Sequence, residues 1–215
     1  MFIHRSRFKR LLAAVLPTLT PLALAAEQAA HVYIVHGYRA TPDDHWFAWL
    51  KQRLEETGTR VSIVELSPAV NPQPQQWQQA LQAQIPHPDE HSWFVTHSLG
   101  SIALLQYLAT RKDLSTVGGY VLVSGFNDRL SNIPQIDGFI RPDLDYRKLI
   151  QLTHNRVVIA ARNDAVVPHA VSAALAKRLE ARFVSLPEGG HFLEAEGFKT
   201  FPRVLEELKK EMSAR

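Results

Sequence analysis

Cysteine is absent from the 215-residue sequence, so the chain has no disulfide bond and no cysteine that could accept a lipid. Metal-binding motifs are missing too, because the ten histidines form neither an H-E-x-x-H motif nor a close His-x-His pair. The chain also has no internal repeat and no extended low-complexity segment. We therefore expect a globular protein that uses no metal ion and no other cofactor.

A surplus of positive charge on the folded domain is missing as well. The formal net charge is +3, but four basic residues lie within the first ten positions: Arg5, Arg7, Lys9 and Arg10. Without these four, the chain has 20 basic and 21 acidic residues. Nucleic-acid binding needs clustered basic residues on the folded domain, so we expect no nucleic-acid partner.

The basic head is followed by an apolar stretch and by the small residues Ala23 and Ala25 in an A-x-A pattern. This order is typical of a secretory signal peptide, which we predict over residues 1–25, with the mature domain over residues 26–215. A disordered N-terminal extension is the alternative. Pro17 and Pro21 interrupt the short apolar stretch, so we expect no stable membrane insertion. A cleaved leader predicts a periplasmic or secreted protein, and an uncleaved one a cytoplasmic protein.

Short apolar runs alternate with helical patterns along the rest of the chain. Several runs are apolar at consecutive positions, which is typical of strands buried on both faces of a parallel sheet. The alternation predicts an α/β fold with a single doubly wound, mostly parallel sheet flanked by helices, and functional loops at the carboxyl ends of the strands. Thr41 and Pro42 are expected to begin the first helix, and Gly58 to end it. The expected strands cover residues 31–35, 61–66, 92–96, 120–123, 156–160 and 182–186, and the expected helices cover residues 43–57, 74–84, 99–110, 145–152, 169–180 and 194–212.

Ser98 lies at the carboxyl end of a central strand and opens a helix. The pattern Thr96-His97-Ser98-Leu99-Gly100 resembles the G-x-S-x-G nucleophile elbow of α/β-hydrolases, in which a strained turn exposes the serine oxygen. The second glycine is present, but Thr96 replaces the first, where a small side chain is favoured. Taken alone, the pattern also fits a serine that caps a helix.

Two later residues complete a Ser-His-Asp arrangement. Asp164 follows the strand predicted over residues 156–160, and His191 lies in a glycine-bearing loop before the last helix. The order nucleophile, acid, histidine is that of the α/β-hydrolase triad, in which histidine takes the serine proton and aspartate orients the histidine. Individually, Asp164 also fits a helix cap and His191 an ordinary loop residue.

Other acidic residues fit the acid position less well. Asp128 follows the strand predicted over residues 120–123 and is the second candidate. Asp143 and Asp145 precede the strand at 156 and read as helix caps.

The oxyanion of such a reaction needs backbone N–H donors. Leu99, the residue after the serine, supplies one, and Tyr38, which follows Gly37 in the loop after the first strand, is expected to supply the second. His97 is expected to pack against neighbouring loops, and the other histidines to be structural or exposed.

The segments "VYIVHGYRATPDDHWFAWL", "FVTHSLGSIALLQYL", "ARNDAVVP" and "EGGHF" together resemble the YdeN-like serine hydrolases, which are related to the retinoblastoma-binding serine hydrolases of the α/β-hydrolase superfamily. The resemblance covers about residues 31–211. It implies a compact α/β-hydrolase with Ser98, Asp164 and His191 as its triad. It also implies that His45 and Trp46 lie near the mouth of the active site and face substrate, with packing on a helix face as the alternative for Trp46.

These observations predict a serine hydrolase that cleaves small carboxylic esters or related acyl bonds through a covalent acyl-enzyme. About thirty residues separate Val123 from Arg156, and they must also hold a helix, so no large lid is expected. The remainder of that segment could form only a rim or a small cap. An amidase or peptidase with the same triad is one alternative. A binding module on a hydrolase fold, without catalysis, is the other. The sequence identifies no protein partner.

Overall fold

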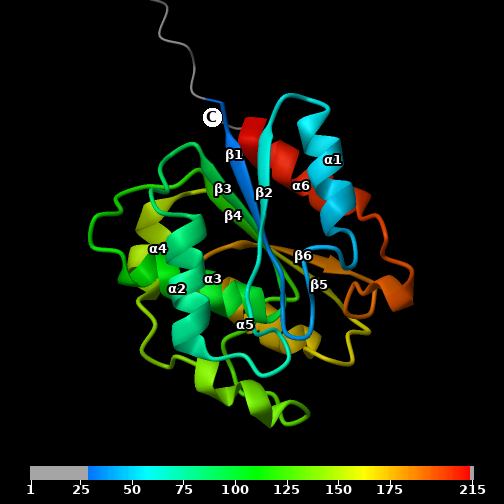
Figure 1. Ribbon diagram of the computed structural model, residues 1–215. Coiled ribbons are helices and arrows are strands. Elements are labelled where there is room, and N and C mark those ends of the chain that lie inside the picture. Colours follow the sequence, from blue (N-terminus) through cyan, green and yellow to red (C-terminus); the bar gives the residue numbers. More distant parts are fainter. Residues whose placement is uncertain (1–28, 214–215) are drawn as a thin grey trace, which may run out of the picture.

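The structure is a computed structural model that describes residues 29–213, and the predicted signal peptide lies outside these residues. Six strands form one sheet: β1 (His31–Val35), β2 (Arg60–Val64), β3 (Ser92–His97), β4 (Gly119–Val123), β5 (Arg156–Ala161) and β6 (Arg182–Leu186). All five neighbouring pairs are parallel, and the order across the sheet is β2-β1-β3-β4-β5-β6 (Figure 1). The predicted single, doubly wound sheet is confirmed, and it is entirely parallel.

The central strands are buried on both faces of the sheet. Every residue of β3, β4 and β5 is buried. Strands of a parallel sheet are joined by helices that cover both faces, so apolar side chains are favoured at consecutive positions rather than at alternate ones. The predicted strand boundaries agree with the structure to within two residues.

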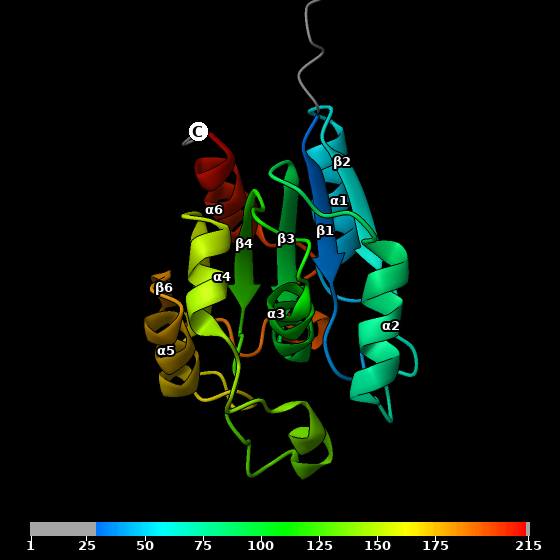
Figure 2. The same cartoon turned by 90° about the vertical axis from the view of Figure 1, so that its left-hand side faces the viewer.

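Residues 29–213 also form six α-helices and two 3₁₀-helices, the last two of which follow the final strand. They are α1 (Phe47–Glu55), α2 (Pro74–Gln84), α3 (Leu99–Thr110), η1 (Pro134–Phe139), α4 (Tyr146–Leu152), α5 (His169–Arg178), η2 (Glu194–Glu196) and α6 (Pro202–Ser213). Helices α1 and α6 cover one face of the sheet, and α2 to α5 cover the other (Figure 2). Each face has its own apolar cluster. Helix α3 follows the central strand β3 and is buried from Leu99 to Leu108. Ser98, the residue between the two, therefore lies at the middle of the carboxyl edge of the sheet.

The expected helix over residues 43–57 is wrong at its start, since α1 begins at Phe47. The Asp44 carboxylate accepts hydrogen bonds from the backbone N–H and the hydroxyl of Thr41, at 2.7 and 2.8 Å, and closes a separate turn. His45 then has φ of +58°, a left-handed conformation that interrupts a right-handed helix. The expected end is correct, because Gly58 has φ of +81° just after the helix.

The expected helix over residues 194–212 is two helices in the structure. Gly197, with φ of +93°, ends η2. Helix α6 starts only at Pro202, which is accepted in the first turn of a helix because its missing N–H would have no partner there.

Within residues 29–213, no large lid covers the carboxyl edge of the sheet. The segment from Ser124 to Asp145 instead packs its apolar side chains into the body of the protein, where Phe126, Ile136 and Phe139 are at most 2 % exposed. The Phe139 ring lies 5.1 Å from the Trp77 ring of α2, and its carbonyl accepts a hydrogen bond from Gln106 of α3. The segment is therefore a short, anchored rim.

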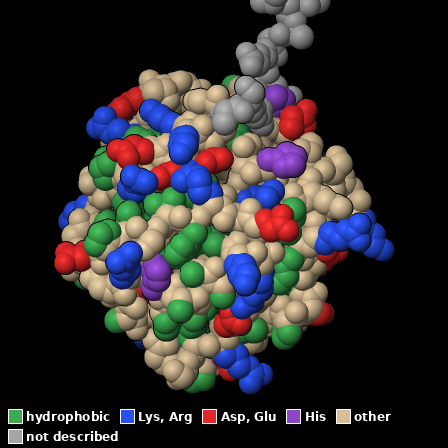
Figure 3. Space-filling model, turned by 180° about the vertical axis from the view of Figure 1, so that it is seen from behind, with side chains coloured by type: hydrophobic (Ala, Val, Ile, Leu, Met, Phe, Trp, Pro, Cys, Tyr) green, Lys and Arg blue, Asp and Glu red, His purple; other side chains and the backbone are tan. Residues whose placement is uncertain are grey.

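None of the helices in residues 29–213 combines the length and the apolar character needed to cross a membrane. On the face shown in Figure 3, Lys and Arg side chains are interspersed with Asp and Glu side chains.

Candidate active site

Ser98 occupies a strained turn between β3 and α3. Its φ and ψ are +53° and −123°, a conformation that is costly for any residue except glycine. Its backbone N–H donates to the Val123 carbonyl of β4 at 2.8 Å. Strain of this kind persists only where the surrounding structure holds it, and here it lifts the serine oxygen away from the helix.

Two glycines let the backbone approach this turn closely. A Cβ atom on Gly100 would lie 2.4 Å from the His36 carbonyl oxygen and 2.7 Å from that of Val35, so α3 rests directly on the end of β1. A Cβ atom on Gly37 would lie 2.9 Å from the His97 carbonyl and 3.0 Å from Ser98 Cβ. Neither position accepts a larger residue without movement of the backbone.

Thr96, the departure from the elbow pattern, is accommodated by a hydroxyl pair. Its Oγ1 lies 2.6 Å from the Oγ of Ser101 on the first turn of α3, and both residues are fully buried. A Cβ atom on Gly125 would lie 2.9 Å from the same Ser101 oxygen, so a small residue in β4's loop makes room for the pair. The threonine therefore links strand and helix where glycine would let them touch.

The structure brings Ser98, His191 and Asp164 into one hydrogen-bonded series. His191 Nε2 lies 3.0 Å from Ser98 Oγ, and His191 Nδ1 lies 2.9 Å from Asp164 Oδ2. All three residues are buried, with 5 to 7 % exposure. Since a carboxylate only accepts, Nδ1 carries the proton in the neutral ring, and Nε2 is free to accept from the serine hydroxyl.

The Asp164 carboxylate is fully hydrogen-bonded. Its Oδ1 accepts from the N–H groups of Val166 and Val167, at 2.8 and 2.9 Å, and its Oδ2 accepts from the Ser124 hydroxyl at 2.8 Å as well as from His191. Ser124 follows β4 with φ of +48° and is completely buried. These four donors compensate the burial of a charged group.

Two side chains from distant segments and one from the loop itself hold the loop that carries His191. The side-chain oxygen Oδ1 of Asn163 accepts a hydrogen bond from the Gly190 N–H at 2.9 Å. The Glu196 carboxylate accepts from the N–H groups of His191 and Leu193, at 2.8 and 2.9 Å. His97 Nε2 lies 2.8 Å from the His191 carbonyl oxygen.

Comparison with known proteins identifies the family of the chain. The family described as "Serine hydrolase" matches residues 32–210. The chain belongs to this serine hydrolase family. It is 37 % identical to YdeN of Bacillus subtilis over 177 residues, which are 82 % of this chain and 93 % of YdeN. It is 22 % identical to the serine hydrolase RBBP9 of Rattus norvegicus over 165 residues, which are 76 % of this chain and 86 % of that protein.

The crystal structure of the B. subtilis ydeN gene product superposes on this serine hydrolase with a TM-score of 0.84. The match has 36 % identity and covers 86 % of this chain and all of the other. Est1E from Butyrivibrio proteoclasticus, at 14 % identity and a TM-score of 0.66, shares the fold. The chain therefore has the compact α/β-hydrolase fold that the sequence motifs predicted.

Of the two backbone amides predicted for the oxyanion, that of Leu99 directly follows the serine, and that of Tyr38 belongs to the loop after β1. Leu99 is the first residue of α3, so its N–H has no carbonyl one turn earlier in the helix to which it could donate. Tyr38 follows Gly37, which touches the serine turn. His36 holds this loop, because its Nδ1 donates to the Gly37 carbonyl and its Nε2 accepts from the Leu66 N–H, both at 2.9 Å. Burial lowers the pKa of His36, which agrees with a neutral ring.

The structure separates His45 from Trp46, which were expected to share the mouth of the active site. Trp46 has no exposed surface and packs against Phe47 and Phe201 in the core beneath α1, so the expectation that it faces substrate is wrong. The left-handed turn at His45 is what directs the next side chain inward. His45 itself is partly exposed, and its Nδ1 accepts from the Glu194 N–H of the histidine loop at 3.1 Å. Burial lowers its pKa.

The remaining acidic candidates lie elsewhere. Asp128 forms an ion pair with Arg178, and Asp145 caps α4 by accepting from the Lys148 N–H at 2.9 Å, as expected of a cap. Asp143 is exposed. Within residues 29–213, no group of three or more His, Asp or Glu side chains is arranged to hold a metal ion.

Ser124, Asn163 and Glu196 were not predicted from the sequence. Ser124 follows a strand that neighbours β3, and its place at the carboxyl edge is the one signal that could have identified it. Asn163 and Glu196 act through contacts with the loop backbone, for which the sequence offers no motif.

Proposed function

We propose that this serine hydrolase cleaves small carboxylic esters through a covalent acyl-enzyme, with Ser98 as nucleophile, His191 as general base and acid, and Asp164 as the orienting acid. The hydrogen-bonded series from Ser98 Oγ through His191 to Asp164 is the observation that supports it. A serine hydroxyl is a weak nucleophile until an adjacent base accepts its proton.

In the first half of the reaction, Ser98 Oγ attacks the acyl carbon while its proton passes to His191 Nε2. The C–O bond to the leaving alcohol then breaks, and His191 returns the proton to the alcohol oxygen. In the second half, His191 takes a proton from water, the hydroxide attacks the acyl carbon, and Ser98 regains its proton as the acid leaves. Asp164 stabilises the imidazolium in both halves.

Two backbone N–H groups, those of Leu99 and Tyr38, stabilise the oxyanion of each tetrahedral intermediate. The close contact between Gly37 and the Ser98 turn supports this assignment, because it brings the loop of Tyr38 beside the start of α3. Donors on a rigid backbone need no reorganisation as the charge develops.

The rim between β4 and α4 supports a preference for small acyl groups. Its Phe126, Ile136 and Phe139 side chains are buried in the core, so they do not line a tunnel for a long acyl chain. Burial of each further methylene would contribute about 0.8 kcal/mol, or about fourfold in kcat/KM. We expect kcat/KM for p-nitrophenyl esters to rise little beyond a few carbons. A steady climb from acetate to palmitate would contradict the preference.

A fluorophosphonate probe tests the proposed chemistry directly. It should label the folded protein at Ser98 and leave Ser98→Ala unlabelled, and the labelled peptide should be identified by mass spectrometry. A matched set of esters and amides, assayed on both proteins, separates an esterase from an amidase or peptidase with the same triad. Folded protein that takes no label would support the binding module instead.

We also propose that residues 1–25 direct export and are removed. The basic head, apolar middle and A-x-A site of the sequence support this. Expression with the native leader in a bacterium should yield a protein that begins near Ala26. An intact Met1 on a cytosolic product, found by N-terminal sequencing, would contradict it.

A further inference from the structure

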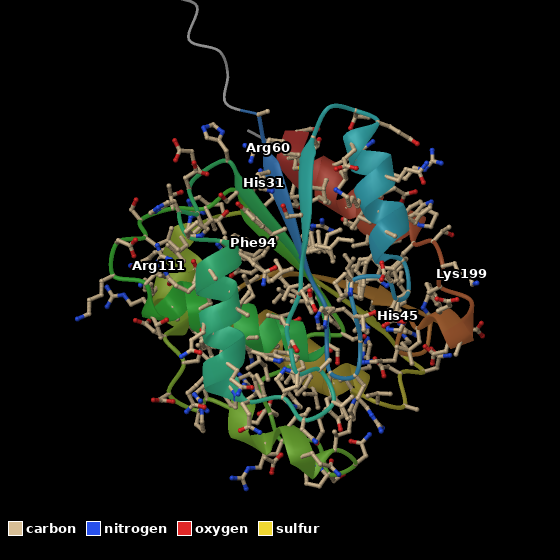
Figure 4. All side chains as sticks on the ribbon, in the orientation of Figure 1. His31, His45, Arg60, Phe94, Arg111 and Lys199 are labelled. Atoms are coloured by element: carbon tan, nitrogen blue, oxygen red, sulfur yellow. The ribbon has the colours of Figure 1, made fainter. Side chains whose placement is uncertain are left out.

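His97 lies directly beneath the loop that carries His191. Side chains alternate along β3, so Thr96 faces α3 and His97 faces the opposite side, towards α1. There the His97 ring is 2 % exposed, with its centroid 4.8 Å from that of His191 and 5.4 Å from that of His45. Figure 4 shows His45 beside the segment of Lys199, far from His31 at the start of β1.

One nitrogen of His97 has a defined partner. Nε2 lies 2.8 Å from the backbone carbonyl oxygen of His191, across 94 residues of sequence. A carbonyl oxygen only accepts, so Nε2 carries a proton. In the neutral ring, Nδ1 is then an unprotonated acceptor.

The other ring nitrogen indicates that filling space is not enough to explain a histidine at position 97. His97 Nδ1 is buried and has no hydrogen-bond partner among residues 29–213. A phenylalanine would fill the same space beside Trp46 and Phe47 without burying an unpaired nitrogen. The bond from Nε2 to the His191 loop is the one interaction of this side chain that phenylalanine could not make.

We propose that His97 is a positioning residue that holds His191 in its catalytic orientation through the His191 carbonyl; this rests on the proposed function. Glu196 holds the N–H of His191, and His97 holds its carbonyl, so the backbone is fixed on both sides of the catalytic residue. The direction of the Cα–Cβ bond is thereby set, and with it the reach of the ring to Ser98 and Asp164. A misplacement of about 1 Å at such a site costs about 10²-fold in rate.

The neutrality of His97 suits the same role. Burial is the largest cause that lowers its pKa well below the ordinary value, and the neighbouring His191, His45 and His36 lower it further. When His191 accepts the Ser98 proton it becomes a cation, and a second cation at 4.8 Å would oppose that step. A lysine or arginine at position 97 could donate the same hydrogen bond but would carry the opposing charge.

The test compares His97→Phe, which keeps a ring of similar size, with His97→Gln, whose side-chain amide can donate from near the position of Nε2. His97→Phe should lower kcat about 10²-fold with little change in KM and no loss of thermal stability. His97→Gln should recover most of the lost kcat. The control His31→Phe makes the same change at the far end of β1 and should keep the wild-type kcat.

Equal kcat in His97→Phe and the wild type would overturn the proposal, and so would equal losses in His97→Phe and His97→Gln. Fluorophosphonate labelling of the wild type separates this failure from that of the proposed function, because the wild type should label whatever the His97 variants do.

A second measurement needs neither activity nor a substitution at His97. Nitrogen NMR of ¹⁵N-histidine-labelled protein should show His97 protonated at Nε2 alone and unchanged from about pH 5 to 8. The signal should persist in His191→Ala, because the acceptor is a backbone carbonyl. A His97 ring that titrates in this range, or carries its proton on Nδ1, would overturn the proposal even if the variants did not fold.

Discussion

The turn at Ser98 is held by backbone packing, whereas the loop at His191 is held by side-chain hydrogen bonds. At the turn, Gly100 lies against the carbonyls of β1 and the Ser98 N–H donates to β4, so neighbouring strands define the shape. At the loop, Asn163 and His97 each hold one backbone group of residues 190–193, and Glu196 holds two.

This difference separates two kinds of sensitivity. Backbone packing is part of the core, so a change at the turn should alter stability and activity together. Hydrogen bonds from the part of the loop that is exposed, residues 194–197, add little to global stability, so a change there should alter the rate while the fold remains intact. Substitutions in the turn and in the loop, each measured for stability and for activity, therefore test whether the two regions differ in this way.

Removal of the Ser98 hydroxyl separates the chemistry of the turn from its shape. Ser98→Ala keeps the backbone and should lower kcat by about 10⁶-fold with an unchanged melting temperature, because the nucleophile is lost and the packing is not. His191→Ala should lose about as much, and the double variant no more than either single one. A double variant that is far worse would show that the two residues do not act as a unit.

The next largest loss of kcat is expected for Asp164, the acid of the hydrogen-bonded series. Asp164→Asn should lower kcat by about 10⁴-fold, because the amide can donate to His191 Nδ1 and so favours the wrong tautomer. Asp128→Asn is the control, since Asp128 lies on a partly exposed ion pair with Arg178 that contributes little. Activity that survives in Asp164→Asn but not in Asp128→Asn would move the acid to Asp128.

Alanine substitutions at two glycines, one in the turn and one in the loop, should differ in their effect on the free energy of unfolding. Gly100→Ala should lower the free energy of unfolding by about 3 kcal/mol, because its Cβ would meet two carbonyl oxygens of β1. Gly197→Ala in the histidine loop should cost only about 1 kcal/mol, from its φ of +93°, since no atom lies within 4 Å of the new Cβ. Urea unfolding of both variants measures the difference, and equal losses would remove the distinction between packed turn and open loop.

The same difference explains what the sequence could predict. The turn was recognisable because strand, serine and Gly100 are consecutive in the chain, and their order at successive strand ends pointed to Asp164 and His191 as partners. The strands were located to within two residues, since their apolar runs reflect burial on both faces.

The failures lie where distant contacts or a single dihedral angle decide the structure. Asp44 bonds back to Thr41 and His45 turns left-handed, so α1 starts late and Trp46 points into the core. His97 packs against neighbouring loops as expected, but its bond to the His191 carbonyl, 94 residues away, was not predicted. No local pattern encodes such a contact.

The smallest expected effect concerns Glu196, whose carboxylate joins the N–H groups of His191 and Leu193. Glu196→Ala frees both groups to bond with water, which lets the catalytic ring drift from Ser98. Because the loop is exposed at Glu196, the fold should lose little, and kcat should fall about tenfold, equivalent to about 1.4 kcal/mol. Glu196→Gln keeps one acceptor oxygen and should lose less. Glu194→Ala is the matched control, because Glu194 lies in the same loop and its carboxylate pairs with Lys199 instead. Steady-state kinetics and thermal melting on the three variants test this together. A Glu196→Ala protein that melts several degrees lower would place the loop in the core with the turn, and one with unchanged kcat would show that His97 and Asn163 suffice to hold His191.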